Sequence, residues 1–292
     1  MDLTIPSSFD GLPLQRAKAV AACRRAQSDE RVLGMCIGGS FAGGAPDVYS
    51  DVDLKLVVED SAAPAVAAGV EALARAAGNV VAFFPGDHLG FDHLFIVLYD
   101  DLVHVDFLVL PLAGLAAESS ETHVAVLWER GDALTSRIAE RVEDSVVDVE
   151  WFERRVWTWL WYGQTKVLRG EVHEALDMLA YLRARVLFPL LAASRGVRPA
   201  AARRAESLTR DLAPAFRKTL GGPDRVEALE AFRAAAGLYE LLSAPLLESR
   251  GIAPASEARA VVRAALDAGL EWEPGHPLPE SESVDGGLEG LP

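Results

Sequence analysis

Two apolar runs flank a glycine-rich polar segment in residues 32–58, which read VLGMCIGGSFAGGAPDVYSDVDLKLVV. The first run, residues 32–37, ends at the Gly-Gly-Ser sequence of residues 38–40, a pattern typical of a strand followed by a tight turn. Residues 51–58 alternate between polar and apolar and then become wholly apolar, which predicts a second strand with one buried end. The segment therefore predicts a strand, a turn and a second strand.

Carboxylates mark the start of the second strand. Successive side chains of a strand point to opposite faces, so Asp51 and Asp53 share one side while Val52 packs into the core. A later apolar strand carries His104 and Asp106 on one face, and if it neighbours the first, three carboxylates converge. Such a cluster repels itself unless a divalent cation neutralises it, and hard oxygen ligands suit magnesium. The alternative is that Asp51 and Asp53 are solvated residues at a strand start.

The glycine-serine turn indicates a phosphate site. Gly38 and Gly39 allow the chain to turn tightly, which leaves backbone N–H groups and the Ser40 hydroxyl to hold a phosphate before a following helix. A phosphate site beside a metal site implies phosphoryl chemistry. By itself, such a turn is common in loops that bind nothing.

The rest of the first half alternates between helix and strand patterns. We expect helices over 11–27 and 61–77, the second capped by Ser61, a strand over 80–84, and an antiparallel hairpin from the runs 91–99 and 102–110. These elements predict a small mixed sheet in a first domain over residues 1–147.

The second half shows helical patterns alone. We expect helices over 150–169, 171–194, 200–220, 223–249 and 256–270, which form an α-helical bundle domain over 148–270. Residues 271–292 are rich in Pro, Gly, Ser and Glu and predict a disordered acidic tail. The predicted fold class is therefore α+β.

Composition excludes several functional classes. With 28 basic and 43 acidic side chains, the formal charge of -15 repels a phosphate backbone, so nucleic acid is not an expected partner. The sequence has neither a secretory signal pattern nor an apolar run long enough to span a membrane, so we expect a soluble, cytoplasmic protein without a membrane partner. The two cysteines cannot form a disulfide framework, and no pattern indicates an oligomeric state.

Taken together, these motifs resemble a known signature. Gly39-Ser40, ten intervening residues, Asp51-Val52-Asp53 at the head of a strand, and a later strand with Asp106 are similar to the signature of the DNA polymerase beta-like nucleotidyltransferase superfamily. The resemblance covers residues 30–110. It implies that Gly39 and Ser40 position the triphosphate of an NTP, that Asp51 and Asp53 bind metal ions, and that Asp106 is a third metal ligand or the general base.

The order of the two domains resembles that of the antibiotic nucleotidyltransferases, which include aminoglycoside and lincosamide adenylyltransferases. This resemblance implies a catalytic domain over 1–147, a substrate-binding helical domain, two Mg²⁺ ions, and transfer of AMP from ATP to a hydroxyl of a small acceptor with release of pyrophosphate. The acidic balance suits a polycation such as an aminoglycoside, and such an activity would confer antibiotic resistance.

Other functions remain open. The acceptor could be a protein hydroxyl or a tRNA end, although the negative charge disfavours the tRNA. A protein of another class, a non-catalytic nucleotide-binding or antitoxin-like protein, could share the fold. Such proteins often lack one of the three acids, and the presence of all three favours an enzyme.

Two lysines are further candidates. Lys166 follows an aromatic helical segment and is predicted to bind the nucleotide by neutralising its triphosphate between the domains; alternatively, its stem packs on the aromatic rings while the ammonium reaches water. Lys55 shares a strand face with Asp51 and Asp53, so it contacts a phosphate or forms an ion pair. His104, on the face of Asp106, is a further catalytic candidate. The nearby aromatic residues are more typical of bundle core than of a base-stacking platform: Trp151, Phe152, Trp157, Trp159, Trp161 and Tyr162.

Overall fold

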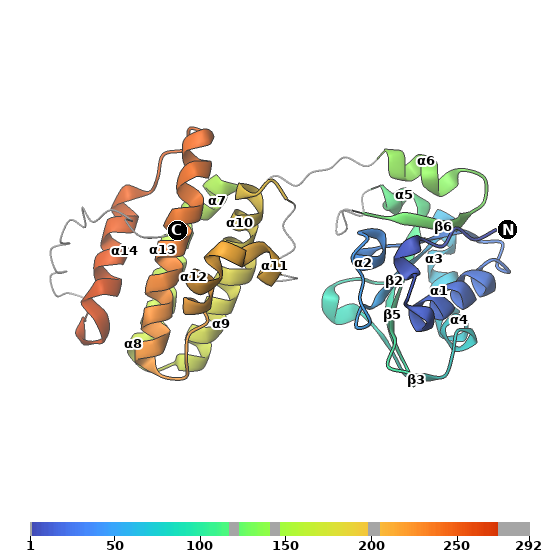
Figure 1. The fold of residues 1–292 in the computed structure, drawn as a ribbon, viewed down its shortest axis with the longest axis horizontal. Coiled ribbons are helices and arrows are strands. Elements are labelled where there is room, and N and C mark those ends of the chain that lie inside the picture. Colours follow the sequence, from blue (N-terminus) through green and yellow to red (C-terminus); the bar gives the residue numbers. More distant parts are fainter. Residues whose placement is uncertain (1, 117–122, 141–146, 198–204, 274–292) are drawn as a thin grey trace. The chain divides into compact units, whose positions relative to one another are not determined.

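The computed structural model describes residues 2–116, 123–140, 147–197 and 205–273. The chain divides into two compact units, Met1–Asp144 and Ser145–Pro292. The described part of the first unit contains a six-stranded mixed sheet, and that of the second consists of helices and their connections (Figure 1). This arrangement confirms the predicted α+β class, a mixed sheet followed by a helical region.

The sheet of the first unit has the strand order β3-β4-β5-β2-β1-β6. β2 and β5 pair in parallel, and the other neighbours pair antiparallel, including the predicted β4–β5 hairpin. The sequence does not predict β6, because its five residues form a run too short to show a period. The strand bounds are β1 Val32–Ile37, β2 Val52–Val58, β3 Val80–Pro85, β4 Leu94–Tyr99, β5 His104–Pro111 and β6 Ala125–Glu129.

Helices α1 (Pro13–Ala26), α3 (Ala63–Ala67) and α4 (Val70–Ala76) pack against one face of the sheet and enclose the main core of this unit. The single helix predicted over 61–77 is wrong, because α3 and α4 are separate helices. Gly69 lies at the N-cap of α4, and a glycine inside a helix loses more conformational entropy than other residues do. Pro64 lies in the first turn of α3, the part of a helix where proline is tolerated. Ser61 lies in a preceding 3₁₀ turn and makes no capping hydrogen bond.

A buried lysine joins α1 to the turn between β4 and β5. Lys18 is 7% exposed, and its Nζ lies 2.9 Å from an Asp101 carboxylate oxygen and 4.2 Å from the centre of the Tyr99 ring. Partial burial alone would raise the pKa of Asp101, but hydrogen bonds from Lys18 and the Val103 amide outweigh it and lower that pKa below its ordinary value. The contact therefore stabilises the charged form of Asp101.

The opposite face of the sheet is covered by α5 (Leu112–Leu115) and α6 (Ala133–Ala139). Their side chains Leu115 and Leu134 form a second apolar cluster with Cys36 and Val57. Side chains alternate along a strand, so Asp53, which precedes Val57 by four residues in β2, points to the same face as Val57. The predicted site residues of β2 therefore lie on this second face.

The described helices of the second unit enclose a core of their own. Among its long helices, α8 and α13 contact each other, and both contact α9 and α14. A Cβ on Gly163 of α8 would lie 2.1 Å from the Phe232 ring of α13, so glycine allows this close approach. None of the described helices of the chain combines the length and the apolar character needed to cross a bilayer. The bounds are α7 Val149–Glu153, α8 Val156–Arg169, α9 Val172–Leu182, α10 Phe188–Ser194, α11 Ala205–Thr209, α12 Ala213–Lys218, α13 Arg225–Ser249 and α14 Ser256–Ala268.

Some sequence predictions for this half differ from the structure or fall outside it. The helix predicted over 150–169 is interrupted between α7 and α8, and the helix predicted over 200–220 begins outside the described residues and is then divided into α11, a 3₁₀ turn and α12. Of the tail predicted over 271–292, residues 274–292 lie outside the described residues.

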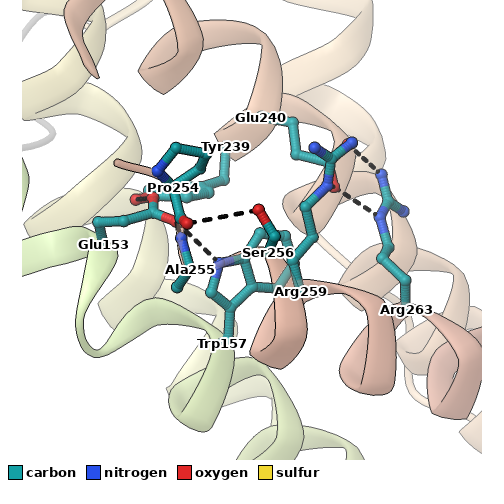
Figure 2. Close-up of polar contacts among 9 residues, drawn as sticks. All are labelled: Glu153, Trp157, Tyr239, Glu240, Pro254, Ala255, Ser256, Arg259 and Arg263. Carbon is teal, nitrogen blue, oxygen red and sulfur yellow. Dashed lines mark hydrogen bonds and ion pairs between the residues drawn. The ribbon is translucent and has the colours of Figure 1, made fainter. Parts of the chain in front are cut away.

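A buried carboxylate links the start of this unit to its last helices. Glu153 is 5% exposed and accepts hydrogen bonds from the Tyr239 hydroxyl, from Trp157 Nε1 at 3.3 Å and from the Ala255 amide at 2.9 Å (Figure 2). Burial raises the pKa of Tyr239, and its interactions with Glu153 act in the same direction. The charge of Glu153 is therefore balanced by three donors from separate segments.

Candidate functional site

Strand register brings the three predicted carboxylates together. Asp53 and Asp106 are directly paired in the parallel β2–β5 ladder, and Asp51 immediately precedes β2. One carboxylate oxygen from each residue lies within 4.8 Å of the others, and all three residues are half-buried. Val52, between the two acids of β2, is fully buried, as predicted. The three acids thus form one carboxylate cluster.

The carboxylate cluster has the chemistry of a cation site. Two unit charges 4.8 Å apart repel by about 3 kcal/mol at an effective dielectric constant of about 20. A divalent cation converts that repulsion into attraction, and carboxylate oxygens are the ligands that Mg²⁺ and Ca²⁺ prefer. Asp51, Asp53 and Asp106 are therefore the described residues that could hold a metal ion.

Gly39 makes room for one of these carboxylates. It has a φ of +55°, and a Cβ at this position would lie 1.9 Å from Asp53 Oδ2. The Gly38 amide donates a 2.9 Å hydrogen bond to the Asp53 carbonyl oxygen, so the turn is joined to the strand that carries the acid. The sequence predicts the turn, but the contact between Gly39 and Asp53 follows only from the three-dimensional structure.

The Ser40 hydroxyl is the second notable group of the turn. Ser40 belongs to the short helix α2 (Gly39–Ala42), and its Oγ is buried without a hydrogen-bond partner among the described residues. A buried polar group without a partner costs about 1–3 kcal/mol, so a ligand oxygen that reached it would recover that cost. This orphaned hydroxyl fits the predicted role of Ser40 in holding a phosphate.

His104 lies beside the carboxylate cluster. Its Nε2 is 2.8 Å from Asp106 Oδ1, and the two side chains share one face of β5. The contact with Asp106 raises the pKa of His104; partial burial opposes this, and the charges of Asp51 and Asp53 add to it. His104 therefore favours its charged form and partly balances the acidic cluster.

The two lysines differ in their surroundings. Lys55 is 4% exposed and lies on the face of β2 that carries Asp53. Lys166 belongs to the second unit, where its Nζ lies 3.1 Å from Glu171 and 3.0 Å from Glu174. Hydrogen bonds with Glu174 first, and then with Glu171, raise the pKa of Lys166. Its ammonium is thus engaged by two carboxylates of its own unit, and its role toward a nucleotide stays a prediction.

The aromatic residues before Lys166 mostly belong to the core of the second unit. Trp157 is 3% exposed, and Phe152, Trp159 and Trp161 pack against the same core, whereas Trp151 and Tyr162 are 40% and 44% exposed.

The structure adds one neighbour of the cluster that the sequence does not single out. Ile96 of β4 is paired with Asp106, so an apolar side chain borders the carboxylates on that side of the sheet. Ile96 occurs in an ordinary apolar run, and only the register distinguishes it from its neighbours.

Comparisons with known proteins give limited similarity. No protein-family model and no curated protein matches the sequence. Two solved structures that the chain resembles are an aminoglycoside 6-adenyltransferase from Bacillus subtilis and a nucleotidyltransferase-like protein from Exiguobacterium sibiricum. The first is 14% identical, covers 87% of this chain and 97% of its own, and has a TM-score of 0.39. The second is 15% identical, covers 80% of this chain and 76% of its own, and has a TM-score of 0.37. Both descriptions name the class of protein that the glycine-serine and aspartate motifs resemble, but at these values a function has to be inferred from the side chains of the chain itself.

Proposed function

We propose that the chain is a Mg²⁺-dependent nucleotidyltransferase that moves a nucleoside monophosphate, AMP from ATP, onto a hydroxyl group of a small acceptor. The observation that carries this proposal is the convergence of Asp51, Asp53 and Asp106 within 4.8 Å. Beside them lie a glycine that makes room for Asp53 and a buried serine hydroxyl without a partner among the described residues. A cation site next to a phosphate site is what phosphoryl chemistry needs.

Asp51, Asp53 and Asp106 would hold the cation, and their hard oxygen atoms fit Mg²⁺. Bound Mg²⁺ would neutralise charge on the attacking and leaving oxygens around the α-phosphorus. Ser40 would donate its hydroxyl to a phosphate oxygen. The turn with Ser40 follows β1, on one side of β2, whereas Asp106 lies on β5, on the other side. We therefore infer that the triphosphate binds toward β1 and the acceptor toward β5.

The placement of the acceptor gives Asp106 a second role. A group that removes the proton of the acceptor hydroxyl must be within hydrogen-bond reach of it. Asp106 is the carboxylate of the cluster on the acceptor side, and His104 Nε2 lies 2.8 Å from its Oδ1. Asp106 is accordingly our candidate for the group that accepts this proton.

The class of acceptor is inferred from charge. The chain carries a net charge of -15, and a strongly negative protein attracts cations and repels anions. We infer a small, positively charged acceptor with free hydroxyl groups, such as an aminoglycoside, so that the activity would modify an antibiotic.

Transfer of label from ATP tests the proposal directly. The full chain is incubated with ATP labelled at the α-phosphate, Mg²⁺, and a panel of aminoglycosides, lincosamides and neutral sugars, and labelled products are separated. We expect a labelled small molecule that requires Mg²⁺. Asp51→Asn and Asp53→Asn should each lower the rate by about a hundredfold or more, because several kcal/mol of charge stabilisation is lost. Asp10→Asn, which changes an exposed carboxylate outside the cluster, should leave the rate unchanged.

A second readout separates loss of activity from loss of folding. Without Mg²⁺, Asp53→Asn should melt at the same or a higher temperature than the wild type, because one repelling charge is removed. Mg²⁺ should stabilise the wild type more than the variant. Full transfer by both Asn variants would contradict the proposed site. ATP binding without transfer would favour the non-catalytic nucleotide-binding protein, and label on the protein itself would indicate a protein hydroxyl as acceptor.

A further inference from the structure

A pocket of about 470 Å³ lies in the second unit and shares no residue with the carboxylate cluster. Its volume falls within the range of small-molecule sites, about 300–1,000 Å³. The rings of Phe188 and Phe216 are stacked in its wall, with centres 4.9 Å apart and planes 2° from parallel. The other apolar lining residues are Ala205, Ala213 and Leu220. The pocket thus offers a largely apolar wall that includes two aromatic rings.

Arg183 reaches this pocket from an irregular helical turn. Residues Arg183–Leu187 form a π turn between α9 and α10, in which the Phe188 amide donates to the Arg183 carbonyl five residues earlier. Pro189 explains the turn, because proline has no N–H and its ring would clash with the carbonyl of Arg185 in a regular α-helix. Single π turns within α-helices occur frequently at functional sites.

The guanidinium of Arg183 has spare hydrogen-bonding capacity. It donates to the Thr219 carbonyl oxygen at the end of α12, which is a structural role. An arginine carries five N–H donors, however, and no carboxylate among the described residues pairs with Arg183. The group is half-buried, and burial lowers its pKa. A half-buried charge without a counter-ion is unfavourable, so an anion in the pocket would stabilise it.

We propose that this pocket binds a small organic carboxylate with one negative charge and an apolar, preferably aromatic, body. The carboxylate would accept hydrogen bonds from Arg183, and the body would lie against Phe188 and Phe216. Arg217 and Glu206 also line the pocket and carry opposite formal charges, so with Arg183 the lining has a formal charge of +1. A nucleoside triphosphate carries several negative charges and does not match this lining. The pocket would therefore take a ligand other than the nucleotide.

Calorimetric titration of the full chain with matched acids and amides tests the proposal. The probes are benzoate, 2-naphthoate and 4-methylpentanoate, each compared with its primary amide in the same buffer, without ATP or Mg²⁺. We expect at least one acid to bind, and its amide to bind about tenfold more weakly or worse, because a charge-assisted hydrogen bond is lost. The measurement uses no nucleotide, so its outcome is independent of whether nucleotidyl transfer is found.

Two arginine variants localise the binding. Arg183→Met should weaken binding of the acid by about tenfold or more and leave the amide unchanged. Arg185→Met is the matched control, because Arg185 lies in the same π turn but is exposed and does not line the pocket. It should bind the acid like the wild type. Circular dichroism checks that both variants are folded; if Arg183→Met is not, Arg183→Lys takes its place, with a several-fold loss expected because lysine cannot bind a carboxylate through a planar fork.

Three results would overturn the proposal. The first is that none of the three acids binds. The second is that each acid binds no better than its amide. The third is that a folded Arg183 variant binds the acid as well as the wild type does.

Discussion

Replacing Gly39 by alanine tests the link between the turn and the carboxylate cluster. The added Cβ would lie 1.9 Å from Asp53 Oδ2, whereas real Cβ atoms stay at least 3.0 Å from such atoms. Either the turn or the Asp53 carboxylate must therefore move by about 1 Å. A displacement of this size in catalytic geometry costs about a hundredfold in rate. We expect Gly39→Ala to lower nucleotidyl transfer by about that factor.

The backbone of Gly39 adds a second, smaller effect that a control can isolate. Its φ of +55° lies in the left-handed region, where a residue with a Cβ is less stable by about 1–2 kcal/mol. Gly44 has a φ of +75°, but a Cβ there meets no atom within 4 Å. Gly44→Ala should therefore lower the free energy of unfolding by about 1–2 kcal/mol and leave the transfer rate near that of the wild type.

Two measurements decide the outcome. Urea unfolding followed by circular dichroism gives the stability of each variant, and the initial rate of label transfer at saturating Mg²⁺ gives its activity. We expect similar backbone costs in both variants and a large loss of rate in Gly39→Ala alone. If Gly39→Ala transfers label as fast as Gly44→Ala, the close contact with Asp53 has no role in the site, and Gly39 serves only the turn.

Three further changes test other parts of the structure. Ser40→Ala should raise the melting temperature, because it removes a buried hydroxyl that has no partner among the described residues. It should also raise the KM for ATP several-fold, because the proposed contact with a phosphate oxygen is lost; steady-state kinetics measure this. Glu153→Gln should destabilise the second unit by about 2 kcal/mol, and Tyr239→Phe by about 1 kcal/mol, in calorimetric melting, since a charged acceptor or one of its donors is lost. Lys18→Met should weaken the acid sensitivity of unfolding. The pKa of Asp101 is lowered in the folded state, so its contribution is present above the ordinary value of 3.8 and is lost as the pH falls below it. Urea midpoints at pH 7 and pH 3 should therefore differ less in Lys18→Met than in the wild type.

Much of the sheet could be predicted because its signals are local. The apolar run 32–37 becomes β1 with the predicted bounds, and the runs around Asp100 and Asp101 become the antiparallel β4–β5 hairpin. Where local signals conflict, prediction fails. The alanine-rich pattern over 61–77 predicts one continuous helix despite Gly69, but the structure has two separate helices there. β6 acquires its strand conformation by pairing with β1, which no local pattern reports.

The candidate site likewise has features that could be predicted from the sequence and features that could not. The alternation of Asp51, Val52 and Asp53 is a property of one strand and could be predicted, and so could the turn at Gly39. The placement of Asp106 opposite Asp53 depends on the parallel register of two strands separated by about fifty residues. The orphaned hydroxyl of Ser40 depends on what packs around it, and tertiary packing of this kind leaves no trace in residue spacing.

The hydrogen bond from the Gly38 amide to the Asp53 carbonyl also bears on where the sequence could accept insertions and deletions. It joins the end of β1 to the start of β2, so the two ends of the loop over residues 41–50 are held in place. Most of this loop is accessible to solvent, and the Tyr49 side chain is 93% exposed. Insertions or deletions near Tyr49 would thus change the rim of the candidate site on the side of β1 while the acids keep their places, which makes this loop the natural position for altering how the proposed nucleotide is admitted.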